Sequence, residues 1–337
     1  MAERIPLVGI SVGDPAGIGA EVTLKALASA PAPDASFVLY AHPRQLEDAA
    51  TSCGLESFVA PIRDWEPFRD EGQRGIWRYG VDLPWPDPFE SGRFSEAGGA
   101  IQREALELAL DDLVSHRIDA LVTAPVNKAI FAEDEEIHGQ SELLALRSAT
   151  SQWAMMLTGP RLSVVLVTTH IPLAEVATSL RVVSIVEKAR VATHFFERFL
   201  GQRPKLALAA LNPHAGEGGL VGDEEIRLLQ PAIEQARAEG IELEGPFPAD
   251  SLFVRAARGE FDAVICLYHD QGLIPLKLLH FDEAVNVTIG PDVIRTSPDH
   301  GVAYDIAGQG IANPTSMRAA IDYAIRCATE AATSDRF

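Results

Sequence analysis

The sequence is poor in cysteine, which limits the kinds of site it can build. Its three cysteines, Cys53, Cys266 and Cys327, lie far apart and form no C-x-x-C pair. An odd number at such spacing suggests neither a disulfide framework nor a thiolate zinc site. Cys266 falls inside a predicted strand and is expected to be a small buried apolar residue in a reducing compartment.

Long apolar runs are also missing. No run approaches the roughly 20 residues that a membrane-spanning helix needs. The first four residues, MAER, lead into a predicted strand without a signal-peptide pattern. We therefore expect a cytoplasmic protein without a membrane span.

Positive charge is scarce. Lys and Arg number 28 against 48 Asp and Glu, and the formal net charge is −20. This net negative charge argues against a general basic surface, so no nucleic-acid partner is expected. The acidity is most simply a solubility or high-salt adaptation, and an anionic substrate would need a local cluster of cations.

The chain does contain short apolar runs, which alternate with segments of helical periodicity. It has 337 residues, 47% of them hydrophobic, enough for two domains or one elaborated α/β domain. The alternation runs from a strand predicted over residues 5–12 to a closing helix over 316–332. It predicts α/β layers. Residues 61–94, rich in Pro, Gly and Trp, show no period and are expected to be irregular. Gly159-Pro160 lies between two predicted strands, 153–157 and 162–169, and suggests a hairpin. Residues 295–301 are expected to form a polar loop.

Three histidines, His170, His214 and His269, each follow an apolar run predicted to be a strand. In an open α/β sheet, ligands bind at the carboxyl ends of strands. A single histidine at such a place is more often a buried or capping residue. Three in the same kind of position could together hold a divalent metal and leave coordination positions open for a substrate.

The stretch from Asp262 to Lys277 is the densest in such residues. An apolar run ends in His269-Asp270-Gln271-Gly272, and Lys277 follows one or two turns later. A capped strand–helix turn would explain this stretch alone, but a site is the interpretation we favour.

Lys277, Asn286 and Arg295 form a second group in the later part of the chain. Lys and Arg suit a phosphate or carboxylate, and Arg can bind it with two parallel hydrogen bonds. Surface charge is the simpler alternative. A glycine turn at residues 13–19 could also direct backbone N–H groups at an anion, although it matches neither Walker A nor G-x-G-x-x-G.

Six sequence blocks follow one another along the chain: GDPAGIG at 13–19, PVNK at 125–128, TTHIPL at 168–173, LNPHAGE at 211–217, YHDQGL at 268–273 and RTSPDHG at 295–301. In these blocks and in their order the chain resembles the 4-hydroxythreonine-4-phosphate dehydrogenases of pyridoxal phosphate biosynthesis. Together the blocks cover nearly the whole chain.

The resemblance implies a two-domain α/β fold of the isopropylmalate dehydrogenase kind, with a mostly parallel sheet and an active-site cleft between the domains. Residues 1–125 and about 300–337 would form the first domain. Residues of about 126–299 would form the second, with the metal and substrate residues and the dimer contacts. The family also implies a homodimer with the site shared between subunits, so that one histidine could come from the partner.

The resemblance further implies roles for residues. The three histidines would ligate a divalent metal (zinc, magnesium or cobalt), and Lys277, Asn286 and Arg295 would hold a small phosphorylated hydroxy acid. Residues 300–308 resemble the adenosine-binding loop of isopropylmalate and isocitrate dehydrogenases. They imply that His300, Gly301 and Asp305 contact NAD, with NADP possible.

One departure from the family pattern concerns the substrate. The family's Gly-His-Thr-Glu stands here as Gly139-Gln140-Ser141-Glu142. Ser141 keeps a hydroxyl, but Gln140 cannot carry a charge, and His138 is a candidate to compensate. The loop at 290–293 also differs from the family pattern. Gln140 and Ser141 are retained as predicted substrate-binding residues.

The predicted function is NAD-dependent oxidation of 4-phosphooxy-L-threonine with decarboxylation to 3-amino-2-oxopropyl phosphate. Asp270 and Lys277 are the candidates for proton transfer and orientation. One alternative is a related dehydrogenase of a threonate or erythronate phosphate. Alternatives from other classes are a non-catalytic metabolite-binding protein and, less favoured, a zinc hydrolase.

Overall fold

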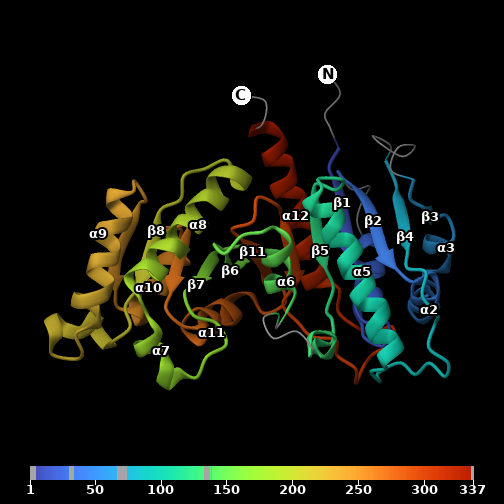
Figure 1. Ribbon diagram of the computed structural model, residues 1–337, viewed down its shortest axis with the longest axis horizontal. Helices are drawn as coiled ribbons and strands as arrows, with labels where there is room; N and C mark the ends of the chain where they lie inside the picture. The colour runs from blue at the N-terminus through green and yellow to red at the C-terminus, as the bar shows by residue number, and fades with distance from the viewer. Residues whose placement is uncertain (1–4, 30–33, 67–73, 133–136, 138, 335–337) are drawn as a thin grey trace. The chain divides into compact units, whose positions relative to one another are not determined.

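The computed structural model describes residues 5–29, 34–66, 74–132, 137 and 139–334 (Figure 1). The chain divides into two compact units: unit 1 comprises Met1–Ala149 and Asp292–Phe337, and unit 2 comprises Thr150–Pro291. The domain boundaries expected from the sequence, near residues 125 and 300, stay a prediction, because a domain is defined by folding or moving independently.

Unit 1 contains a parallel sheet. Its strands lie in the order β3-β4-β2-β1-β5-β12, and the neighbouring strands pair in parallel. They are β1 (Leu7–Ser11), β2 (Ser36–Ala41), β3 (Arg63–Asp64), β4 (Ile76–Gly80), β5 (Ala120–Thr123) and β12 (Arg295–Pro298). All six residues of β2 are buried, as expected for a parallel strand covered on both faces.

The expectation that residues 61–94 are irregular is wrong for two segments, β3 and β4. β4 pairs with β2, so its register is fixed by a strand far away in the sequence. A two-residue edge strand such as β3 is too short to show any period.

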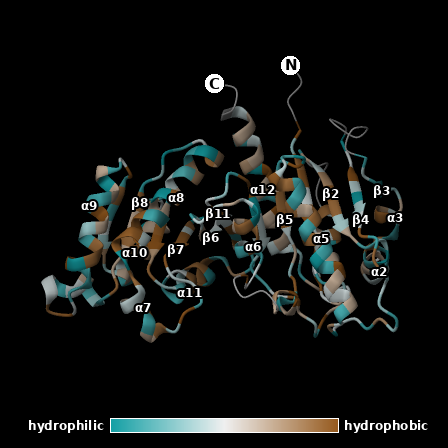
Figure 2. Cartoon of the chain, in the orientation of Figure 1, coloured by the Kyte–Doolittle hydropathy of each residue, from teal (hydrophilic) through white to brown (hydrophobic). Residues whose placement is uncertain are grey.

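Helices cover this sheet, and the apolar core of unit 1 lies between them and the strands (Figure 2). The long helix α5 begins after Ser95, whose hydroxyl accepts a hydrogen bond from the Gly98 amide at 3.1 Å. The helical elements are α1 (Gly19–Ala28), α2 (Pro43–Cys53), α3 (Glu56–Val59), α5 (Glu96–Val114), η1 (Lys128–Phe131), α6 (Gln140–Arg147) and α12 (Thr315–Ser334).

Unit 2 contains a mixed sheet with the order β11-β6-β7-β10-β8-β9. The hairpin predicted around Gly159-Pro160 is confirmed, because β6 and β7 pair antiparallel. β11 also pairs antiparallel with β6, and the remaining neighbours pair in parallel. The strands are β6 (Ala154–Gly159), β7 (Leu162–Leu166), β8 (Leu206–Ala209), β9 (Leu243–Phe247), β10 (Ala263–Cys266) and β11 (Val285–Ile289).

A second apolar core, which includes Cys266 and Leu276, fills unit 2. Cys266 is buried in β10, as expected, and burial raises the pKa of its thiol. The helical elements are α7 (Leu173–Ser179), α8 (Val182–Leu200), η2 (Pro213–Gly219), η3 (Glu225–Leu229), α9 (Gln230–Ala238), α10 (Ala249–Ala256) and α11 (His269–His280).

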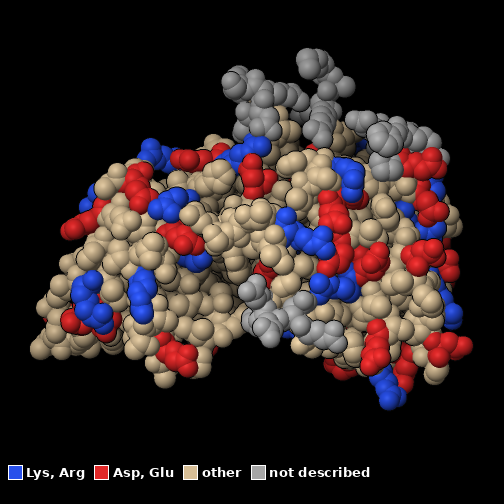
Figure 3. All heavy atoms as spheres, in the orientation of Figure 1, with Lys and Arg blue, Asp and Glu red and all other residues tan. Residues whose placement is uncertain are grey.

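The predicted α/β fold with mostly parallel strands is therefore confirmed. Acidic and basic side chains are interspersed on the face of the molecule shown in Figure 3. Within the described part of the chain, none of the helices is both long and apolar enough to pass through a membrane.

Candidate active site

The three predicted metal ligands follow three neighbouring strands of unit 2. His170 comes after β7, His269 after β10 and His214 after β8, each within five residues of the strand's end. These strands are adjacent in the order β7-β10-β8 and run parallel. Their carboxyl ends therefore share one edge of the sheet, where open α/β sheets bind ligands.

His170 and His269 lie close together. Their ring centroids are 5.7 Å apart. The segments that carry them are joined by a hydrogen bond from the Thr168 hydroxyl to the Leu267 carbonyl at 2.7 Å. Nδ1 of His269 lies 2.7 Å from a carboxylate oxygen of Asp270, which fixes the ring and leaves Nε2 as the nitrogen available to a ligand.

His214 has the same kind of partner. Its Nδ1 lies 2.5 Å from a carboxylate oxygen of Glu217, and this hydrogen bond raises the pKa of the exposed imidazole. A carboxylate behind Nδ1 is the usual arrangement of a metal-bound histidine, so the donor groups suit a divalent metal. Among the described residues of this one chain, no three His, Cys, Asp or Glu side chains are grouped tightly enough to hold a metal ion.

Gln271 ties two of these segments together. It is buried, its amide donates to the Ala210 carbonyl, and its side-chain oxygen accepts from the Leu267 amide, both at 2.7 Å. The loops that carry His214 and His269 are thus held by one side chain. This role of Gln271 was not expected from the sequence, since no spacing rule links Gln271 to the end of β8.

Arg295, the predicted phosphate ligand, lies in unit 1 at the start of β12. It is only 4% exposed. The expectation of a polar loop over 295–301 is wrong for 295–298, because these residues pair in parallel with β5. The guanidinium donates to the Thr123 hydroxyl, with Nε at 3.0 Å and Nη2 also within hydrogen-bond distance. Burial lowers the pKa of Arg295 to about 10.

The two residues that depart from the family pattern both face Arg295. The Gln140 side-chain oxygen accepts from Arg295 Nη2 at 3.0 Å, and its amide donates to the Ala124 carbonyl at 3.3 Å. The Ser141 hydroxyl lies 3.4 Å from Nη1. In this chain Gln140 therefore acts as a neutral acceptor that orients the arginine. His138, the candidate for compensation, lies outside the described residues.

Lys277 and Asn286 belong to unit 2. Lys277 is on α11, two turns after His269, and is partly buried. Asn286 is on β11, and its side-chain oxygen is buried without a hydrogen-bond partner among the described residues. Buried polar atoms are nearly always paired, so this oxygen suits a hydrogen-bond donor on a ligand.

Comparison with known proteins shows the family of the chain. The family model "Pyridoxal phosphate biosynthetic protein PdxA" matches residues 34–324. The chain belongs to the PdxA family. The predicted family is thereby confirmed.

Relatives extend over the whole chain. A 4-hydroxythreonine-4-phosphate dehydrogenase of Desulfosudis oleivorans is 43% identical over an alignment of 334 residues, which covers 95% of each chain. A protein of Cutibacterium acnes, provisionally named D-threonate 4-phosphate dehydrogenase, is 40% identical and covers 95% of this chain and 93% of its own. The crystal structure of the Klebsiella pneumoniae 4-hydroxythreonine-4-phosphate dehydrogenase superposes with a TM-score of 0.85 at 35% identity, covering 98% and 100% of the two chains.

In this PdxA family member, the predicted cofactor residues His300, Gly301 and Asp305 lie in the loop after β12. The same loop contains Tyr304, whose hydroxyl donates to the Asp14 carboxylate and accepts from the Asn127 amide, the latter at 2.7 Å. Burial raises the pKa of the Asp14 carboxyl. Asp14 belongs to the glycine turn at residues 13–19, so this turn is bound to the predicted cofactor loop.

Helix α1 holds the next part of that loop. The Gly308 amide donates to the buried Glu21 carboxylate at 2.6 Å. The Lys25 ammonium donates to the carbonyls of Gly310 and Ala312 at 2.8 and 2.6 Å. The loop was expected from the sequence, but its hydrogen-bond partners Glu21 and Lys25 were not, because these two residues have the spacing of ordinary helix residues.

Proposed function

We propose that this PdxA family member is an NAD-dependent dehydrogenase of 4-hydroxythreonine 4-phosphate in pyridoxal phosphate biosynthesis. It would oxidise the substrate's secondary alcohol and convert the β-keto acid to 3-amino-2-oxopropyl phosphate with loss of carbon dioxide. The observation that carries this proposal is the full-length similarity to proteins named for that activity. The three histidines at adjacent strand ends support it.

The proposed metal ligands are His170, His214 and His269, through their Nε2 atoms. A bound divalent metal would supply Lewis-acid polarisation of the reacting hydroxyl, and NAD would supply the hydride acceptor. Imidazole donors suit zinc or cobalt better than magnesium. Asp270 is assigned to orienting His269, because its carboxylate is bound to the ring, and Lys277 is assigned to proton transfer.

Arg295 is the proposed phosphate ligand. Its guanidinium is buried, and Thr123, Gln140 and Ser141 around it are neutral acceptors. An incoming phosphate would stabilise this buried cation with charge-assisted hydrogen bonds. Asn286 is proposed to accept a hydrogen bond from a ligand, because its side-chain oxygen is buried without a hydrogen-bond partner among the described residues. His300, Gly301 and Asp305 are the proposed NAD contacts.

The test of this function is NADH formation, followed at 340 nm with 4-hydroxythreonine 4-phosphate, NAD and Zn²⁺, Co²⁺ or Mg²⁺. We expect turnover that EDTA abolishes and added metal restores. Replacing NAD by NADP in parallel determines the cofactor. No NADH from any hydroxy-acid phosphate, despite metal binding, would favour the non-catalytic metabolite-binding alternative.

A second candidate substrate is D-threonate 4-phosphate. Gln140 replaces the family's histidine beside Arg295, the proposed phosphate ligand, and one relative carries a threonate phosphate name. If only D-threonate or D-erythronate 4-phosphate is turned over, the proposed mechanism still holds, but the proposed substrate is wrong. Turnover of the threonine phosphate would make Gln140 a tolerated difference.

We propose that the active unit is a homodimer with a shared metal site, in the cytoplasm. The three cysteines are free thiols, which suits a reducing compartment. An exposed apolar stripe at α11 supports the dimer: Ile274, Leu278 and Phe281 are 66%, 84% and 73% exposed and recur at helical spacing. Such a stripe is typical of an interface.

Leu278→Asp is expected to convert the dimer into a monomer and to remove activity, because a carboxylate would be buried in the interface. Light scattering coupled to size-exclusion chromatography measures the mass. Val183→Asp, at an exposed apolar position on α8, is the control and should remain dimeric. A dimeric, fully active Leu278→Asp protein would exclude this stripe as the interface.

A further inference from the structure

The loop that carries His214 has an unusual backbone. Residues 214–218 are all left-handed, and three of them are not glycine: His214, Ala215 and Glu217 have φ of 53°, 55° and 44°. Left-handed conformations are unfavourable for residues with a Cβ and normally occur singly. Contacts from outside the turn must therefore stabilise this left-handed conformation and keep His214 in its position.

Glu225 is the residue that contacts the base of this turn. It is only 2% exposed and begins the π-helical segment η3, a kind of distortion often found at functional sites. One carboxylate oxygen accepts hydrogen bonds from the backbone amides of Leu211 and Asn212 at 2.9 and 2.7 Å. The other accepts from the Asn212 side-chain amide at 2.8 Å.

Glu225 also touches the turn itself. A Cβ added to Gly216 would lie 2.8 Å from the same carboxylate, so glycine at this position allows the close approach. The Val221 amide donates to the Gly216 carbonyl at 3.0 Å and closes the turn. One buried carboxylate thus contacts both the entry and the middle of the left-handed segment.

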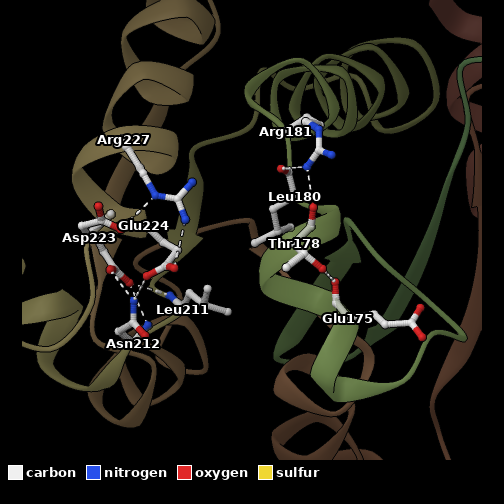
Figure 4. Close-up of polar contacts among 10 residues, drawn as sticks. Glu175, Thr178, Leu180, Arg181, Leu211, Asn212, Asp223, Glu224 and Arg227 are labelled. Atoms are coloured by element: carbon white, nitrogen blue, oxygen red, sulfur yellow. Dashed lines mark hydrogen bonds and ion pairs between the residues drawn. The ribbon is translucent and has the colours of Figure 1, made fainter.

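The neighbouring Glu224 differs from Glu225 in its partners. Figure 4 shows Asn212 donating to Glu224, and Arg227 bridging Glu224 and Asp223. The distances are 2.8 Å from Asn212 to Glu224 and 2.8 and 3.1 Å from Arg227 to Asp223 and Glu224. Glu224 binds the side chains of Asn212 and Arg227, whereas Glu225 also binds two backbone amides of the loop.

We propose that Glu225 is a positioning residue for the metal site: it holds the left-handed turn that presents His214. The inference rests on the proposed metal-binding role of His214. Glu225 is buried and bound to the loop with both of its oxygens, so it acts through His214 and not on the metal.

The test is the metal affinity of Glu225→Gln, measured by Co²⁺ absorption and Zn²⁺ calorimetry on the full-length protein. Glutamine has nearly the same shape as glutamate, but its side-chain amide group replaces one carboxylate oxygen. This amide is a hydrogen-bond donor, and it would face N–H groups that are themselves donors. We expect metal binding about 10- to 100-fold weaker, as for other outer-shell changes. Glu224→Gln is the matched control and should bind within about threefold of the original protein, since side-chain contacts of this kind contribute little.

A rescue experiment separates positioning from a general structural role. Ala215→Gly removes the Cβ that disfavours the left-handed conformation, so it should restore much of the metal affinity lost in Glu225→Gln. Ala215→Val tests the turn with Glu225 intact, and should also weaken metal binding because β-branched residues are strongly disfavoured at this φ. Normal affinity in Ala215→Val, or absence of rescue in a folded double variant, would overturn the proposal.

The two hypotheses fail in different ways. If the original protein binds no Co²⁺, or binds it equally well after His214→Ala, the proposed metal role of His214 is wrong. If His214→Ala abolishes binding but Glu225→Gln leaves it unchanged, only the positioning role of Glu225 is wrong.

Discussion

Replacing His269 by alanine is expected to lower kcat/KM by about three orders of magnitude or more. The variant loses one imidazole of the proposed metal site, and Lewis-acid stabilisation of a developing alkoxide contributes several kcal/mol. Each 1.36 kcal/mol corresponds to about a tenfold change in rate. NADH formation at saturating Zn²⁺ or Co²⁺ measures the loss, and Co²⁺ absorption shows whether the site still binds.

The structure provides graded controls for this variant. Asp270→Asn weakens the carboxylate behind His269 Nδ1, which lies 2.7 Å away, and should cost about 10- to 100-fold. His194→Ala removes an exposed histidine on α8 of the same unit and should leave activity unchanged. A loss in Asp270→Asn as large as that in His269→Ala would assign Asp270 a direct role in proton transfer and contradict its assignment to orientation.

The histidine positions illustrate what sequence alone can predict. An apolar run followed by His is a local pattern, and in parallel strands the carboxyl ends share one edge of the sheet. That rule needs no knowledge of which strands are neighbours. The order β7-β10-β8, which makes the three strand ends before these histidines adjacent, is a long-range property that only the structure supplied.

Other features could not be predicted from the sequence, because they also depend on contacts between distant segments. β12 was expected to be a loop because Arg295-Thr296-Ser297-Pro298 has no apolar pattern, yet it pairs with β5 about 170 residues earlier in the chain. The left-handed turn at His214 is contacted by Glu225, and the loop proposed to bind NAD is hydrogen-bonded to Asp14 and Glu21. Each is a polar contact between segments that no periodicity or spacing rule connects.

Replacing Arg295 by methionine is expected to produce the second large loss. Truncating one partner of a buried, hydrogen-bonded charge pair costs roughly 2–5 kcal/mol. This corresponds to a fall in kcat/KM of about 30- to several thousand-fold. The loss should appear mainly in KM for the phosphorylated substrate, because the guanidinium is assigned to the non-reacting phosphate. Initial rates over a range of substrate concentrations separate KM from kcat.

The buried Arg295 also leads to a prediction about stability, which can be tested without substrate. Burial lowers the pKa of Arg295 to about 10 from an ordinary value of 12.5. Between these two pH values the unfolded chain binds more protons, so this residue's contribution to stability rises with pH there. At neutral pH the contribution is unfavourable, and a bound anion should offset it.

Inorganic phosphate is therefore expected to raise the melting temperature of the original protein, since a ligand at 100 times its Kd stabilises by about 2.7 kcal/mol. Arg295→Met should show no such rise, although Thr123 and Gln140 lose a hydrogen-bond donor in both conditions. That structural cost is the same with and without phosphate, so it cancels in the comparison. An equal phosphate-dependent rise in the variant would place the anion elsewhere, and Arg295 would then be a structural cation of β12.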